Sequence, residues 1–120
     1  PTEIKATIEA AKTLKNKLLV IFQPHRYSRT NILFNEFINV LSKINYLLIL
    51  DTFSAGEKKI KGATSKDLYL EISKINKSVI YLKNINNLNE LLDKEVKKKN
   101  TIIFMGAGSI TNIAKRYINN

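Results

Sequence analysis

The chain contains no cysteine and no tryptophan, and it has only one histidine, two prolines and four glycines among 120 residues. Without cysteine it forms no disulfide and offers no thiolate to a metal, and a single histidine argues against a self-contained zinc site. No apolar run approaches the roughly 20 residues of a membrane-spanning helix, and no basic-then-apolar leader is seen. We therefore expect a compact cytoplasmic domain with one core.

Acidic residues are also scarce, because 20 lysines and arginines face 10 aspartates and glutamates, giving a net charge of +10 and a pI near 9.8. This charge could attract phosphates, nucleic acid or an anionic surface. We favour another origin for the lysines, since abundant Lys, Asn and Ile with few Gly, Pro and Arg is typical of A/T-rich codons. Arginine is then informative: only Arg26, Arg29 and Arg116 occur, and a guanidinium can grip a carboxylate or phosphate with two hydrogen bonds.

Short apolar runs predict four buried strands, at residues 17–22, 46–50, 78–82 and 101–105. Helical periodicity occupies the stretches around them, at residues 1–15, about 30–44, 64–75, 87–97 and 110–117. Because helices alternate with buried strands, we predict one three-layer α/β domain over residues 1–120. Its sheet should be mostly parallel, with helices on both faces.

Capping signals mark the starts of two of these helices. Thr64 or Ser65 should cap the third helix, and residues 87–90 have the spacing of a capping box with Asn87 as the cap. Lysines at 97–99 should complement the negative end of that helix rather than bind a ligand. The first helix begins on Pro1 without a lead-in, so we expect the chain to be a piece of a longer protein.

The candidate site follows the first strand, where residues 23–30 read QPHRYSRT. Parallel strands end on one rim, so this turn should meet residues 51–57 and 106–109, and ligands bind at such rims. Arg26 and Arg29, with His25 beside them, indicate an anion-binding corner. Asp51 and Glu57 could orient the arginines, act as bases or be solvated loop acids, and Tyr27 is expected to pack.

The turn at residues 106–109 (GAGS) does not match a dinucleotide-binding fingerprint. Thr111 occupies the third fingerprint position, and the turn follows the last strand rather than the first. Either it is a tight turn for close helix packing, or its backbone amides, with Gly108 and the Ser109 hydroxyl, face the crevice. The chain also lacks a GxxxxGK[ST] loop, so we do not expect it to hold a nucleoside triphosphate by itself.

Residues 22–30 closely resemble a signature of the Mur ligases, the ATP-dependent ligases of peptidoglycan synthesis. Residues 1–4, 50–57 and 105–110 resemble further family segments in the same order and spacing. The resemblance covers essentially the whole chain but only the C-terminal third of the three-domain family protein. It implies a Rossmann-like C-terminal domain that binds the incoming amino acid. The branch that joins L-alanine to UDP-N-acetylmuramate fits best, and the murein tripeptide recycling ligase is the alternative within the family.

In this family ATP, with magnesium, activates the muramoyl carboxylate as an acyl phosphate, which the amine of L-alanine then attacks. The resemblance implies that His25, Arg26 and Arg29 hold the alanine carboxylate and offset charge on the reacting groups. Gly108 and Ser109 would line the site. The nucleotide loop, magnesium ligands and UDP site would lie in the central and N-terminal domains. This chain alone should then be inactive and bind no cofactor, with its sheet one strand short.

Two further interpretations of the sequence lie outside this family. A small basic nucleic-acid-binding module would gather basic residues on one face, with exposed aromatics for stacking. Most aromatics here, such as Phe22, Phe34, Phe37 and Phe104, sit at apolar-periodic positions and should be buried, so we expect neither nucleic acid nor membrane as a partner. The other reading is a structural domain that has lost catalysis.

Overall fold

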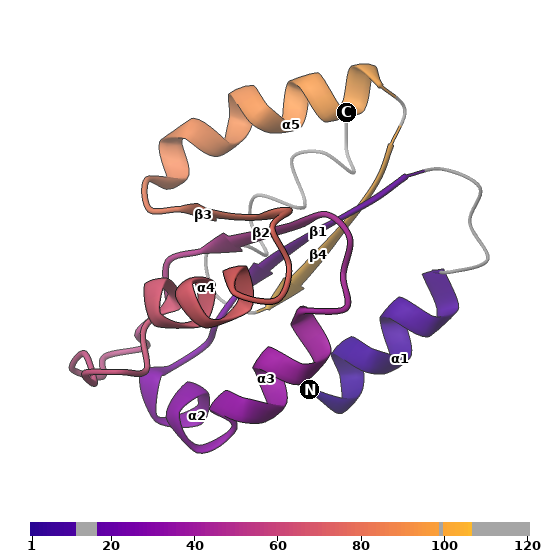
Figure 1. Ribbon diagram of the computed structural model, residues 1–120. Coiled ribbons are helices and arrows are strands. Elements are labelled where there is room, and N and C mark those ends of the chain that lie inside the picture. Colours follow the sequence, from indigo (N-terminus) through magenta and orange to yellow (C-terminus); the bar gives the residue numbers. More distant parts are fainter. Residues whose placement is uncertain (12–16, 99, 107–120) are drawn as a thin grey trace.

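The sheet is the centre of the computed structural model, which describes residues 1–11, 17–98 and 100–106. Its described strands run parallel in the order β3-β2-β1-β4 (Figure 1). They are β1 (Leu18–Gln23), β2 (Leu47–Leu50), β3 (Val79–Leu82) and β4 (Thr101–Gly106). The carboxyl ends of all these strands therefore lie on one rim, as the sequence predicts.

Helices cover both faces of this sheet. They are α1 (Thr2–Ala11), α2 (Tyr27–Ile32), α3 (Phe34–Leu41), α4 (Ser65–Ser73) and α5 (Leu88–Lys97), the last preceded by the 3-10 turn η1 (Ile85–Asn87). Figure 1 shows α1, α3 and α4 on one side of the sheet and α5 on the other. The prediction of a parallel α/β domain with helices on both faces is confirmed. Among the described residues, no helix is long and apolar enough to cross a membrane.

The alternation of side chains along β1 builds a core on each face. Val20 and Phe22 belong to the core beneath α3 and α4, whereas Leu19 and Ile21 belong to the core beneath α5. All these side chains are buried, as is every residue of β2. Strands buried on both faces read as unbroken apolar runs, which is why their positions could be predicted from the sequence.

The helical stretch expected from about residue 30 is divided in two. α2 begins earlier, at Tyr27, and ends at Ile32; Leu33 (φ −105°, ψ 18°) separates it from α3. The prediction of one helix was wrong because apolar periodicity reports a buried face and not a break between two short helices. Residues 12–15 of the first expected helix, and the whole helix expected at 110–117, lie outside the described residues.

One of the two expected caps is present. Thr64 caps α4 in a capping box, since its hydroxyl accepts from the amide of Asp67 (3.2 Å) and its amide donates to the Asp67 carboxylate (3.0 Å). The capping box at Asn87 was wrong: Asn87 has helical backbone angles and makes no side-chain cap. The turn η1 moves the start of the helical segment back to Asn84, whose side chain accepts from the amide of Asn86 (3.0 Å).

Candidate functional site

Residues 23–30 run from the last residue of β1, through the connecting turn, into the first residues of α2. We name this segment the arginine turn. Beside it lies a cavity of about 360 Å³ at the carboxyl ends of β1 and β4. Its lining comes from the start of α1, the end of β1, the arginine turn, α3 and β4: Pro1, Glu3, Ile4, Thr7, Phe22, Gln23, His25, Arg29, Phe37, Ile103, Phe104, Met105 and Gly106. The structure thus brings His25 and Arg29 to one cavity, while Arg26 is not among its lining residues.

Both arginine side chains of the turn are exposed. Among the described residues, neither guanidinium has an ion pair or a hydrogen bond, so each can still bind an anion. His25 is half-buried, and its ring stacks on Phe53, with centroids 5.7 Å apart and planes 10° from parallel. Within the described part of the chain, the site therefore combines two cations that form no ion pair with an imidazole that stacks on an aromatic ring.

Arg26 has a backbone conformation that is rare for a residue with a side chain, with φ 70° and ψ 139°. Neighbouring backbone groups hold it there. Its amide donates to the carbonyl of Phe53 (2.8 Å), and the amide of Phe53 donates to the carbonyl of Pro24 (2.9 Å). The carbonyl of Arg26 accepts from the hydroxyl of the buried Thr30 (3.0 Å). Strained backbone of this kind persists where surrounding contacts fix it, and it clusters at functional sites.

Glu57 is bound to the arginine turn through both carboxylate oxygens. Oε1 accepts from the Ser28 amide at 3.0 Å, and Oε2 accepts from the Ser28 hydroxyl at 2.6 Å. The Ser28 bonds, with smaller contributions from the amide of Tyr27 and the charge of Arg26, lower the pKa of Glu57, so it stays ionised at neutral pH. The sequence alone leaves the role of Glu57 open.

A tight turn, residues 54–57, places Glu57 next to Ser28. The amide of Glu57 donates to the carbonyl of Ser54 (3.0 Å), closing a four-residue turn. Its two central residues, Ala55 (φ 51°) and Gly56 (φ 87°), both have positive φ, as in a type I′ turn. Glycine adopts that conformation without steric cost, which explains why it stands at position 56.

Asp51 lies on the part of the rim next to β3. Its Oδ1 accepts from the Tyr81 hydroxyl at 3.0 Å, and its carbonyl accepts from the Gln23 side chain at 3.2 Å. Burial, with Asp51 as the second cause, raises the pKa of Tyr81 to about 12. A second, open groove of about 650 Å³ lies here, lined by Gln23, Asp51, Thr52, Phe53, Ser54, Lys83, Asn84 and Ile85. Asp51 is thus occupied with β3 and not with the arginines.

The third turn expected at the rim begins with Gly106, which pairs in register with Gln23. Gly108 and Ser109, the other predicted binding residues, lie outside the described residues. The part of the chain that the structure describes contains no group of three or more His, Cys, Asp or Glu side chains able to hold a metal ion.

No family model matches this chain. The UDP-N-acetylmuramate–L-alanine ligase of Wigglesworthia glossinidia brevipalpis is 42% identical to it over 119 residues, covering 97% of the chain and 25% of that relative. The ligase of the same name from Carboxydothermus hydrogenoformans is 34% identical over 119 residues, covering 98% of the chain and 26% of the relative. The chain spans about a quarter of the length of these curated relatives. Over nearly its whole length it is thus homologous to one part of the UDP-N-acetylmuramate–L-alanine ligases of the Mur ligase family.

Proposed function

We propose that this chain is the C-terminal, amino-acid-binding domain of an ATP-dependent ligase that joins L-alanine to UDP-N-acetylmuramate in the cytoplasm. The observation that carries the proposal is the cavity where His25 and Arg29 meet the start of α1, beside an arginine that has no ion pair among the described residues. Homology to ligases of that name supplies the reaction and its substrates.

The charges of the arginine turn suit the carboxylate of an amino acid. A guanidinium offers two parallel N–H donors to a carboxylate, and charge-assisted bonds of this kind are stronger than neutral ones. Arg29 reaches the cavity directly, and Arg26 adds a second positive charge at its side. Fixed cations also stabilise negative charge that develops on an attacked carbonyl oxygen, so the same turn would favour formation of the amide.

The residues that the structure describes do not form a site that fits ATP or magnesium. The sequence has no GxxxxGK[ST] phosphate loop, and the described residues offer no cluster of metal ligands. We assign to this chain the binding and orientation of the amino acid and, as the resemblance to the Mur ligases implies, we place the nucleotide and metal in the central domain of the complete ligase. UDP-N-acetylmuramate would be held through the N-terminal domain.

A nucleic-acid-binding role has less support. Phe22 and Phe37 are only 5% and 6% exposed, and both belong to the core beneath α3 and α4. Base stacking needs aromatic faces that a strand can reach, and these two rings are not available for it. A positive net charge alone then predicts only weak, salt-sensitive attraction to phosphates.

Phosphate release by the full-length ligase tests the proposal, with ATP, UDP-N-acetylmuramate and varied L-alanine. Arg29→Ala should remove about 2–4 kcal/mol of transition-state stabilisation. This corresponds to a roughly 30- to 1000-fold lower kcat/KM for alanine. Lys43→Ala, which removes an exposed cation after α3, serves as the matched control and should be neutral. Equal kinetics for Arg29→Ala and wild type would mean that the arginine turn does not bind the amino acid.

A further inference from the structure

We propose that Glu57 is a positioning residue of the site, because its carboxylate caps the start of α2 and thereby fixes the arginine turn. The inference rests on the proposed function, since it assigns Glu57 to the residues that would bind the amino acid. It resolves the three roles that the sequence leaves open for Glu57, which are base, solvated acid and orienting group.

The start of α2 has no cap of its own. The N-cap residue is Arg26, whose side chain carries no acceptor and makes no capping hydrogen bond. The first amides of a helix need acceptors, which a nearby Ser, Thr, Asp or Asn usually supplies. Here the acceptor is Glu57, 29 residues along the chain from Ser28, whose amide and hydroxyl it binds at 3.0 and 2.6 Å.

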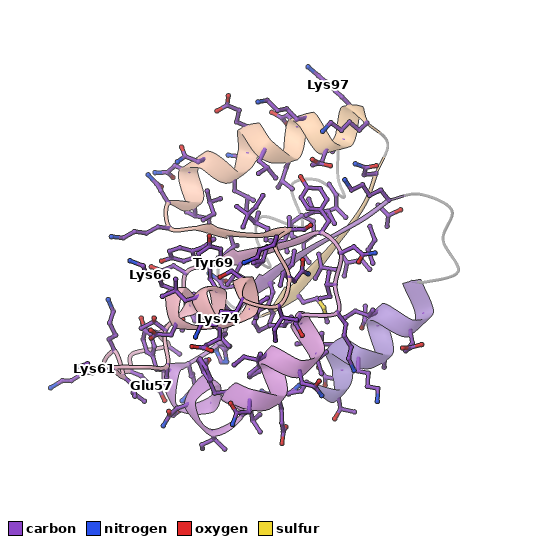
Figure 2. The ribbon with its side chains drawn as sticks, viewed as in Figure 1. Glu57, Lys61, Lys66, Tyr69, Lys74 and Lys97 are labelled. Carbon is purple, nitrogen blue, oxygen red and sulfur yellow. The ribbon has the colours of Figure 1, made fainter. Side chains whose placement is uncertain are left out.

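The loop that carries Glu57 is attached to the arginine turn at two places. One attachment is the pair of backbone bonds between Phe53 and residues Pro24 and Arg26, reinforced by the stacking of His25 on Phe53. The other is Glu57 itself. Figure 2 shows Lys61 projecting outward from the tip of this loop, while Glu57 lies nearer to α2. Arg26, with its positive φ, belongs to the first attachment through its amide, and it stands two residues before Ser28, where the second attachment is made.

The contacts of Glu57 argue against a direct role on the ligand. Both of its oxygens are engaged by Ser28, and it is not among the residues that line the cavity. A carboxylate aimed at the cavity would repel a carboxylate ligand, whereas one bound to the first turn of α2 does not face it. Glu57 therefore acts through Ser28, whose neighbour Arg29 lines the cavity.

The test uses the full-length ligase with Glu57→Gln, Ser28→Ala and the double variant. Glu57→Gln keeps the shape of the side chain but loses the charge and one acceptor. We expect it to raise the KM for alanine about tenfold, the effect of a lost cap, with the KM for ATP changed less than about twofold. Ser28→Ala should raise it less, because the amide of Ser28 remains. The double variant should have the same KM for alanine as Glu57→Gln alone, because the two substitutions break the same contact between Ser28 and Glu57.

Hydrogen exchange at the Ser28 amide gives a readout that does not depend on any ligand. In Glu57→Gln this amide should exchange about tenfold faster, while amides of the β1 core keep their protection. Glu71→Gln is the matched control, because among the described residues this acid of α4 forms an ion pair only with the exposed Lys74 (2.9 Å), the C-cap residue of that helix, and it should change neither measurement.

The outcomes separate this inference from the proposed function. Wild-type exchange at Ser28 and a wild-type KM for alanine in Glu57→Gln, with a raised KM in Arg29→Ala, would overturn the role of Glu57 and leave the proposed function intact. Additive effects of Glu57→Gln and Ser28→Ala would also overturn it. If Arg29→Ala leaves alanine binding unchanged, the proposed function fails, and exchange at Ser28 alone decides whether Glu57 holds the turn.

Discussion

Gly106 lies directly opposite Gln23 at the carboxyl ends of β4 and β1, and a Cβ at Gly106 would stand 2.5 Å from the Gln23 carbonyl oxygen. The contact is with backbone, so it cannot be relieved by turning a side chain. The φ of Gly106, 139°, is also one that residues with a Cβ rarely adopt. The close approach joins the two strands at the edge of the cavity.

Gly106→Ala should therefore destabilise the chain by about 2–3 kcal/mol, from backbone strain and overpacking together. Urea unfolding at neutral pH measures the change. Gly62→Ala is the control, because Gly62 has φ 86° but nothing within 4 Å of an added Cβ, so it reports the conformational cost alone. Equal losses in the two variants would show that the Gln23 carbonyl moves away at no cost.

A buried carboxylate at the opposite end of the sheet predicts acid sensitivity. The carboxylate of Glu95, which is only 2% exposed, accepts from the Tyr46 hydroxyl and from the side-chain amide of Asn100, each at 2.7 Å. Burial alone would raise the pKa of Glu95, but these bonds and the charges of Lys98 and Lys17 outweigh it, so the pKa is lowered. The resulting stabilisation is present above the ordinary glutamate pKa and is lost as the pH falls toward the lower, folded-state value.

Glu95→Gln should make the chain about 1–2 kcal/mol less stable at neutral pH, with the difference from wild type shrinking as the pH falls below the ordinary glutamate pKa. Urea unfolding across this pH range tests it. Glu90→Gln, an exposed acid on the same helix, should stay within about 0.5 kcal/mol of wild type throughout. A constant difference between Glu95→Gln and wild type at all pH values would contradict the lowered pKa.

The two capping signals in the sequence should now give different results. Thr64→Ala removes a cap that the structure contains and should cost about 1 kcal/mol of unfolding free energy. Asn87→Ala removes a side chain that caps nothing and should be neutral within about 0.5 kcal/mol. Thermal or urea unfolding of both variants decides, and a loss in Asn87→Ala equal to that in Thr64→Ala would mean that α5 begins at Asn87 in solution.

The sequence predicted the sheet well because its signal is local. A strand such as β1 is buried on both faces, so consecutive residues such as Val20, Ile21 and Phe22 are all apolar. Contacts between distant segments leave no such pattern. The bond from Ser28 to Glu57 spans 29 residues and that from Tyr81 to Asp51 spans 30, and neither partner is distinctive alone.

The candidate site was predictable in part for the same reason. Because parallel strands end on one rim, residues 25–30 and 51–57 were expected to lie close together. The β-bridge between His25 and Phe53 shows that they do. The sequence could not show which neighbouring element each of these side chains contacts. Asp51 binds Tyr81 of β3, and Glu57 binds Ser28 of α2. Of the two arginines in the arginine turn, only Arg29 lines the cavity.

That difference between the arginines yields the last prediction. Lysine keeps the positive charge but loses the planar pair of donors, so it should fail where a guanidinium grips a carboxylate and suffice where only charge is needed. In the full-length ligase, Arg29→Lys should raise the KM for alanine about tenfold or more, the effect of one lost charge-assisted bond. Arg26→Lys should raise it less than about threefold, because Arg26 lies outside the cavity lining.

Saturation curves for L-alanine at fixed ATP and UDP-N-acetylmuramate measure both variants, with unfolding temperatures to show that each is folded. If Arg26→Lys is the more damaging change, the amino acid binds on the Arg26 side of the turn. If neither variant changes turnover or the KM for alanine, the arginines are structural, and the homology describes the ancestry of this chain without locating its site.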